Sequence, residues 1–123
     1  MKQPVILIAD DEQEVRAFLK ELLLKKIHCV VQEAADGAQA IELVRQGTFD
    51  LLLLDVKMPG LTGIDVIKQV AKISPRTKIV VISAYDSQDV SDRALEAGAV
   101  DYILKSYLNE EIEAKIKRAL IIP

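Results

Sequence analysis

The stretch FDLLLLDVKMPG, residues 49–60, decides the fold of this 123-residue chain. It places four consecutive leucines directly before an acid, Asp55, and a Met-Pro-Gly sequence follows. A short run that is apolar on both faces is typical of a strand buried inside a parallel sheet. Tightly packed leucines would hold the carboxylate at the tip of the strand in a defined position. The stretch therefore predicts a central strand over 51–55 that ends in Asp55.

Four other apolar runs have strand length, and longer amphipathic segments separate them. The predicted strands cover residues 5–9, 29–34, 51–55, 78–83 and 101–105. The predicted helices cover residues 12–26, 36–46, 62–73, 86–97 and 108–120. The first helix carries apolar residues at helical spacing, namely Val15, Phe18, Leu19, Leu22 and Leu23. Strands that alternate with helices indicate an α/β fold with a doubly wound, five-stranded parallel sheet and five helices.

The composition indicates one domain with an aliphatic core. Half of the residues are hydrophobic, 4% are aromatic, and a formal net charge of −3 provides no basic surface for nucleic acid. The single cysteine, Cys29, cannot form an internal disulfide, which is typical of a reducing compartment. The first apolar run is too short for a signal peptide, and no window reaches membrane-spanning length. We expect a single cytoplasmic domain over residues 1–123 that contacts neither nucleic acid nor membrane.

Polar side chains stand at the carboxyl ends of the predicted strands, where open parallel sheets place their ligand sites. They are Asp10 and Asp11 after the first strand, Asp55 after the third, Ser83 after the fourth and Lys105 after the fifth. Three neighbouring carboxylates repel one another, and a hard cation such as Mg²⁺, which prefers oxygen ligands, relieves the repulsion. A hydroxyl and an ammonium beside them suit a phosphoryl group. The set predicts a Mg²⁺ site that handles phosphoryl groups.

Each of these residues also has a plainer interpretation. Asp10 and Asp11, taken alone, are better explained as N-caps of the helix that follows them. Asp55 is as readily a turn residue, and Ser83 and Lys105 are uninformative singly. Their order along four strand ends favours the shared site, because together they supply the acids, the hydroxyl and the ammonium that phosphoryl transfer needs.

The chain resembles the response-regulator receiver domains of two-component signalling over essentially its whole length. LLLLDVKMPGLTGID resembles the family's phosphorylation motif, and Asp10-Asp11 resembles its acid pair. Ser83-Ala84 resembles its hydroxyl with a small residue, and EAGAVDYILK resembles the run into its lysine. The resemblance implies a flavodoxin-like sheet with strand order 2-1-3-4-5.

The resemblance also implies how the site would react. Asp55 would accept a phosphoryl group from a sensor histidine kinase or a histidine phosphotransfer protein. Mg²⁺ would be bound by Asp11, Asp55 and the backbone carbonyl of Lys57, with help from Asp10. Lys105 would pair with a phosphoryl oxygen. The protein would catalyse its own phosphotransfer and slow dephosphorylation without turning over external substrates.

The resemblance further implies a conformational switch. Ser83 would hydrogen-bond the phosphoryl group after transfer, and the ring of Tyr102 would then turn inward. The signal would reach an output domain or a partner protein through a face formed by helix 86–97, strand 101–105 and helix 108–120. The bulky Tyr85 would shield the phosphoryl group and slow its hydrolysis.

Ser106 departs from the family, in which a proline, often in cis, usually follows the lysine. A cis bond before a residue other than proline costs about 2.5–4 kcal/mol. We therefore predict a trans bond between Lys105 and Ser106, from which the long lysine side chain reaches Asp55.

Three other functions stay open from the sequence. An aspartyl-nucleophile phosphatase needs a second acid two residues after the nucleophile, where this chain has Lys57. A flavin-binding protein of the same fold needs a phosphate-binding loop after the first strand, where this chain has the acidic ADDEQE. A receiver-like module that only binds proteins would not need the complete acid, hydroxyl and lysine set. A stand-alone regulator and an excised receiver are about equally expected.

Overall fold

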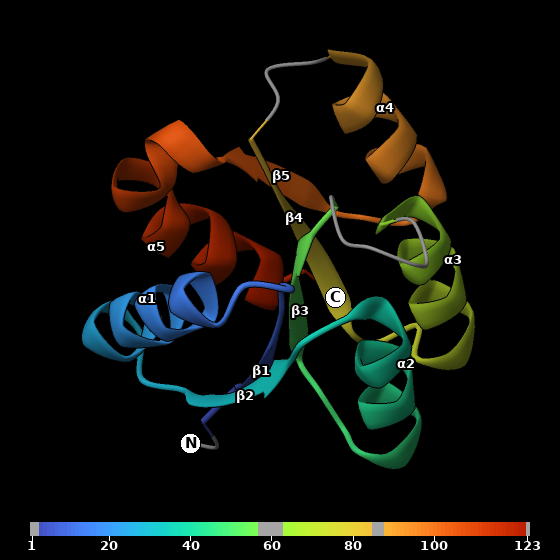
Figure 1. Cartoon of the computed structure of the whole chain (residues 1–123), viewed down its shortest axis with the longest axis horizontal. Coiled ribbons are helices and arrows are strands. Elements are labelled where there is room, and N and C mark those ends of the chain that lie inside the picture. The colour runs from blue at the N-terminus through green and yellow to red at the C-terminus, as the bar shows by residue number, and fades with distance from the viewer. Residues whose placement is uncertain (1–2, 57–62, 85–87, 123) are drawn as a thin grey trace.

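The computed structural model describes residues 3–56, 63–84 and 88–122, which form a parallel sheet between two layers of helices (Figure 1). The strands are β1 (Val5–Ala9), β2 (Val30–Ala34), β3 (Leu51–Asp55), β4 (Lys78–Ser83) and β5 (Asp101–Leu104). The helices are α1 (Gln13–Lys26), α2 (Gly37–Gln46), α3 (Gly63–Ile73), α4 (Gln88–Ala97) and α5 (Leu108–Leu120), and a 3-10 turn, η1 (Lys105–Tyr107), precedes α5. The strand order is β2-β1-β3-β4-β5, which confirms the predicted topology.

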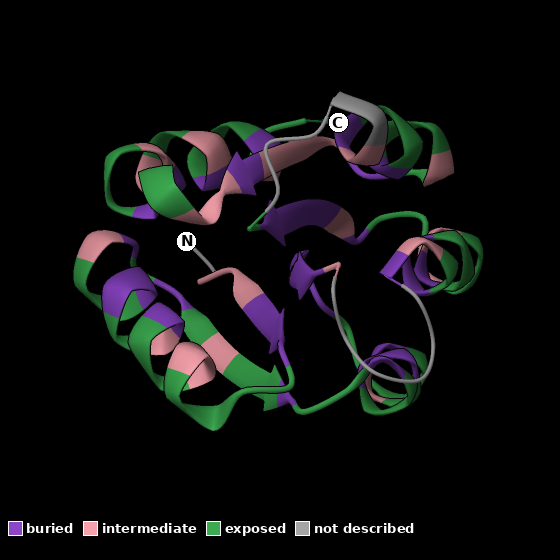
Figure 2. Ribbon diagram, turned by 45° about the horizontal axis from the view of Figure 1, so that its top comes forward, coloured by how far each residue is buried: buried purple, intermediate pink, exposed green. Residues whose placement is uncertain are grey.

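The leucine run of β3 is buried on both faces of the sheet, as predicted. α1 and α5 cover one face, and α2, α3 and α4 cover the other (Figure 1). Leu51 and Leu53 pack in the cluster that includes α1 and α5, whereas Leu52 and Leu54 pack in the cluster under α2, α3 and α4. All four are at most 1% exposed. Figure 2 shows the buried residues concentrated on the central strands and the inward sides of the helices, whereas β2 is mostly exposed. Each of the four leucines contributes about 1.5–3 kcal/mol through burial.

Phe18 is the exception to the predicted apolar face of α1. It belongs to the helix but is 47% exposed, whereas Leu19, Leu22 and Leu23 are buried. Successive residues of a helix are rotated by about 100°, so Phe18 lies at the margin of the face that Leu19 turns toward the sheet. Phe18 instead lines a surface pocket between α1 and the start of α5, beside Asn109.

Gly98 ends α4, as the sequence predicted, and its backbone explains the choice of residue. Its φ is 130°, the only positive value among the described residues, and side chains other than hydrogen are strained there. The Ala99 N–H then donates to the Ala94 carbonyl oxygen at 3.0 Å, which satisfies a helix-end acceptor. Within the described ranges, no helix has the length and apolar character needed to cross a membrane.

Gly63, the first residue of α3, packs directly against the backbone that follows Asp55. A Cβ at Gly63 would lie 2.4 Å from the Cα and 2.7 Å from the carbonyl oxygen of Val56. The Gly63 N–H also donates to that oxygen at 3.2 Å. The absence of a side chain at Gly63 therefore lets α3 begin close to the strand end that carries Asp55.

We predict that Gly63→Ala lowers the free energy of unfolding by about 1–3 kcal/mol, because overpacking forces backbone to move. Gly47→Ala is the matched control, since its Cβ would meet nothing closer than 3.4 Å and its φ of −128° suits alanine. Urea denaturation measures both variants. Equal stability of Gly63→Ala and wild type would show that the close approach to Val56 has no energetic consequence.

Candidate functional site

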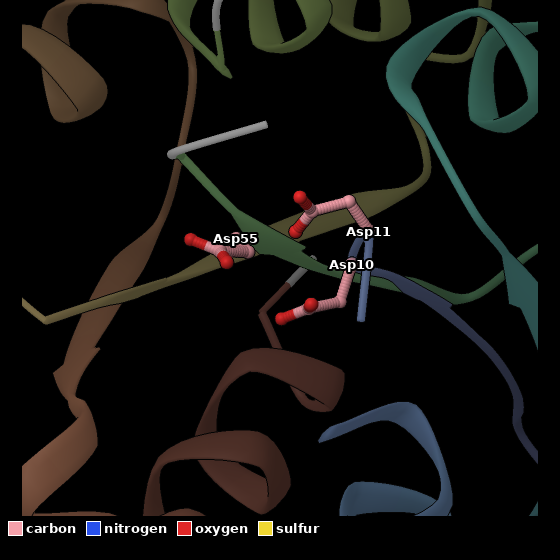
Figure 3. Close-up of side chains that lie close together, drawn as sticks. All are labelled: Asp10, Asp11 and Asp55. Atoms are coloured by element: carbon pink, nitrogen blue, oxygen red, sulfur yellow. The ribbon is translucent and has the colours of Figure 1, made fainter. Parts of the chain in front are cut away.

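Three carboxylates meet at the carboxyl-terminal edge of the sheet (Figure 3). Asp10 and Asp11 follow β1, and Asp55 ends the adjacent strand β3. One carboxylate oxygen from each residue lies within 4.8 Å of the others. In Figure 3 the side chains of Asp10 and Asp11 extend from the end of β1 toward the end of β3. Asp10 and Asp55 are 1% and 4% exposed, whereas Asp11 is exposed and gives the cluster its opening to solvent.

Asp10 has the most unfavourable environment of the three acids. Its Oδ1 accepts a hydrogen bond from the Glu12 N–H at 2.9 Å. Its Oδ2 is buried without a hydrogen-bond partner in the described part of the protein. Burial and, to a lesser extent, the neighbouring Asp55 together raise the pKa of Asp10 from 3.8 to about 6, against the opposing effects of the Glu12 N–H and Lys105. A bound cation would satisfy the unpartnered oxygen, so the donor set fits Mg²⁺.

The N-cap interpretation of Asp10 and Asp11 is wrong. α1 begins at Gln13, and the residue in the N-cap position is Glu12, whose side chain makes no capping hydrogen bond. Asp10 accepts from the N–H of Glu12 itself, one position before the helix. This bond occupies one carboxylate oxygen and leaves the other, Oδ2, without a hydrogen-bond partner among the described residues.

Lys105 reaches the cluster from the opposite side. Its Nζ lies 3.3 Å from Oδ2 of Asp55, an ion pair in which the Asp55 side chain is only 5% exposed. No peptide bond among the described residues is cis, so the bond between Lys105 and Ser106 is trans, as predicted. The long side chain therefore reaches Asp55 without a proline after it.

Ser83 lies at the same edge of the sheet as Asp55. It ends β4 and is 3% exposed. Its neighbour in the chain, Ile82, pairs with Asp55 in the register between β3 and β4. Ser83 is thus one position farther along its strand than the partner of Asp55.

Tyr102 lies on the edge strand β5, next to Val81 of β4 and partly buried against the cluster under α2, α3 and α4. Lys115 of α5 donates to the Tyr102 carbonyl oxygen at 2.7 Å. The Lys115 Nζ also lies 5.0 Å from the centre of the Tyr102 ring, within range of a cation–π interaction. It forms ion pairs with Asp101 at 3.7 Å and Glu111 at 3.4 Å. These contacts tie the backbone of β5 to α5 at Tyr102.

The structure therefore brings Asp10, Asp11, Asp55 and Lys105 together, with Ser83 at the same edge. Lys57 and Tyr85 lie outside the described residues. The sequence pattern did not single out Lys115 or Arg16, which donates to the Asp10 carbonyl oxygen. The acceptors of these two hydrogen bonds are backbone carbonyl oxygens, so residue spacing carries no signal for them.

Comparison with known proteins agrees with this geometry. Residues 6–117 match the response regulator receiver domain family. The chemotaxis protein CheY of Thermotoga maritima is 38% identical over 102 residues, which cover 83% of this chain and 85% of that protein. Sporulation initiation phosphotransferase F of Bacillus subtilis is 33% identical over 120 residues, which cover 98% of this chain and 96% of that protein.

A solved structure has the same architecture. The response regulator protein TrrA of Thermotoga maritima, in complex with Mg(2+)-BeF, matches with a TM-score of 0.85 and 33% identity, over 95% of this chain and 99% of that one. The family match extends from β1 to α5 and so includes all three acids of the cluster. From this match and the acidic cluster, we conclude that the chain belongs to the response regulator receiver domain family of two-component signal transduction.

Proposed function

We propose that Asp55 accepts a phosphoryl group from a sensor histidine kinase or a histidine phosphotransfer protein. The observation that carries this proposal is the position of Asp55. It ends the buried central strand, lies within the acidic cluster and pairs with Lys105 at 3.3 Å. The name of one relative, a phosphotransferase of Bacillus subtilis, supports a phosphotransfer role.

In the proposed step, a carboxylate oxygen of Asp55 forms a bond to phosphorus. The bond between phosphorus and the donor nitrogen breaks, and its electron pair stays with the donor imidazole. The product is an acyl phosphate on Asp55. Lys105, which pairs with Asp55 at 3.3 Å, would pair with a phosphoryl oxygen as that oxygen arrives.

Asp10, Asp11 and Asp55 would hold Mg²⁺, and the backbone carbonyl of Lys57 is the further ligand that the family resemblance implies. When bound, Mg²⁺ neutralises charge on the phosphoryl oxygens. Two observations support this assignment. The buried Oδ2 of Asp10 lacks a partner among the described residues, and TrrA was solved in complex with Mg(2+)-BeF.

Transfer would place a phosphoryl group with a charge of about −1.5 to −2 beside Ser83, in exchange for the single negative charge of the Asp55 carboxylate. We propose that the Ser83 hydroxyl then donates to the phosphoryl group and that the Tyr102 ring turns inward. The Lys115 contacts to Tyr102 would have to adjust, because they join β5 to α5. The changed face of α4, β5 and α5 would act on an output domain or a partner protein.

Three further statements belong to the same proposal. The chain works as a single receiver domain over residues 1–123. It promotes its own phosphorylation and slow dephosphorylation, and it does not turn over external substrates. It acts in the cytoplasm, which the buried free thiol of Cys29 supports, since free thiols persist in reducing compartments.

The proposal is tested by incubating the protein with acetyl phosphate and Mg²⁺ and measuring its intact mass. We expect the mass of one phosphoryl group to be added. Hydroxylamine should remove it, because hydroxylamine cleaves acyl phosphates but not serine phosphoesters. Replacing Mg²⁺ with a chelator should prevent the gain. A gain that survives hydroxylamine would contradict phosphorylation on a carboxylate.

A further inference from the structure

Arg16 of α1 connects three segments beside the acidic cluster. Its guanidinium donates from one terminal nitrogen to the Asp10 carbonyl oxygen at 2.8 Å. Its Nε donates to Oε1 of Glu33, on β2, at 3.2 Å. The side chain is only 15% exposed, although Glu33 is 34% exposed. A planar guanidinium with donors in fixed directions is suited to such a bridge.

The Asp10 carbonyl oxygen belongs to the peptide unit that joins Asp10 to Asp11. The contact with Arg16 therefore sets the plane from which both acids depart. The other side of Asp10 is also held, because its N–H donates to the Ala34 carbonyl oxygen at 3.2 Å. Its Oδ1 accepts from Glu12 at 2.9 Å. These three bonds together leave Asp10 Oδ2 as the unpartnered oxygen of the cluster.

Asp11 depends on the same backbone plane. Among the described residues, its carboxylate takes part in the cluster but makes no hydrogen bond or ion pair with another side chain that could orient it. The Cα of Asp11 therefore lies between two held peptide units, the one that Arg16 contacts and the one whose Glu12 N–H donates to Asp10. Small rotations of the unit that Arg16 contacts would move both acids relative to Asp55.

We infer that Arg16 is a positioning residue, which holds the Asp10–Asp11 peptide so that both carboxylates face the Mg²⁺ position, with Glu33 fixing the guanidinium. The inference rests on the proposed function, since it concerns the same Mg²⁺ site. Residues that orient metal ligands commonly change metal affinity by about 10–100-fold when they are removed. Arg16→Met should therefore weaken Mg²⁺ binding about tenfold.

The sign of the change separates positioning from simple electrostatics. Arg16 carries a positive charge close to the acids. By repulsion alone, this charge would weaken the binding of Mg²⁺. If charge were the whole effect, Arg16→Met would bind Mg²⁺ more tightly than wild type. Positioning predicts weaker binding by Arg16→Met. It also predicts weaker binding by Arg16→Lys, which keeps the charge but loses the planar bridge.

The experiment is a Mg²⁺ titration of the full chain, without a phosphodonor, followed by amide NMR shifts. Lys117→Met is the matched control, because Lys117 forms an ion pair with Glu113 at 2.8 Å within α5 and carries the same charge. We expect its Mg²⁺ affinity to equal that of wild type. Amide hydrogen exchange of Glu12, which donates to Asp10, should accelerate in Arg16→Met and not in Lys117→Met.

A second pair of variants covers the case in which Arg16→Met does not fold. Arg16→Lys and Glu33→Leu change the bridge without removing a large side chain, because lysine lacks the planar guanidinium and leucine cannot accept from the Arg16 Nε–H, and both should weaken Mg²⁺ binding severalfold. If the folded Arg16 variants bind Mg²⁺ as tightly as wild type or more tightly, the inference about Arg16 is overturned, while the proposed function stands. A wild type that binds no Mg²⁺ would instead refute the proposed site, and this inference with it.

Discussion

Replacing Asp55 with asparagine is expected to abolish phosphoryl uptake from acetyl phosphate. The amide lacks the anionic oxygen that would bond to phosphorus, and no other carboxylate occupies the same place. Asp10 is buried with one oxygen bonded to the Glu12 N–H, and Asp11 is exposed at the edge of the cluster. Neither pairs with Lys105, whose Nζ lies 3.3 Å from Asp55. Intact mass after incubation with Mg²⁺ and acetyl phosphate measures the loss.

Asp50→Asn is the matched control for this variant. Asp50 lies just before β3, whereas Asp55 ends the same strand. Its Oδ2 accepts from the Val5 N–H at 2.8 Å, a bond that an asparagine oxygen can preserve. Asp50→Asn should therefore take up phosphoryl groups as wild type does. Equal uptake by Asp55→Asn and wild type would remove Asp55 as the acceptor.

Replacing Asp10 with asparagine should stabilise the metal-free protein near neutral pH. Burial, with the added effect of Asp55, raises the pKa of Asp10 from 3.8 to about 6. When folding raises the pKa of a group, the protonated group contributes fully to the free energy of unfolding below the unfolded-state pKa. This contribution is lost as the pH rises through the folded-state pKa. The loss therefore falls between about pH 4 and pH 6. Above this window the ionised carboxylate destabilises the fold by at most about 3 kcal/mol, since each pKa unit corresponds to about 1.36 kcal/mol.

Asparagine keeps an oxygen for the Glu12 N–H and removes the ionisation. We expect Asp10→Asn to exceed wild type in unfolding free energy by about 1–3 kcal/mol near pH 8 in the presence of a chelator. The difference should shrink below about pH 4, where wild-type Asp10 is protonated. Urea denaturation across this range measures it. Comparing the two proteins at each pH cancels the titration of the other acids.

Two controls sharpen this prediction. Asp36→Asn removes the same charge at an N-cap of α2 that accepts from the Gln39 N–H, and asparagine caps equally well. Its stability should stay within about 0.5 kcal/mol of wild type. Adding Mg²⁺ should stabilise wild type more than Asp10→Asn, because a ligand that binds only the folded state raises its stability. A metal-free Asp10→Asn that is less stable than wild type would contradict the stated cost of the buried charge.

The fold could be predicted from the sequence because hydrophobic patterning acts locally. Leu51 to Leu54 can be buried on both sides only between two layers of helices, which identifies a central parallel strand. Gly98 ends α4 because its backbone angle strains other residues. Hydrophobic patterning predicts less well which helix side chains at the edge of the core are exposed. It could not show that Phe18 is exposed, since that depends on how α1 is rotated against the sheet.

The residues of the candidate site could be predicted for a similar reason. Parallel strands bring their carboxyl ends to one edge, so Asp10, Asp11, Asp55, Ser83 and Lys105 were expected to meet there. The structure places the three acids within 4.8 Å of one another and Lys105 beside Asp55. Their chemical types and their order along the chain were sufficient for this prediction.

The sequence by itself thus determined the order of the elements, the buried strand that ends in Asp55 and the set of acids at the sheet edge. Only the tertiary structure decided how each acid is held. The choice between a helix cap and a cluster ligand for Asp10 depends on where α1 starts, at Gln13. The unpartnered Oδ2 of Asp10 and the bridge from Arg16 depend on contacts with neighbouring segments and with the backbone. Spacing along the chain carries no record of such contacts, because backbone carbonyls are present at every residue and only folding selects which of them a side chain reaches.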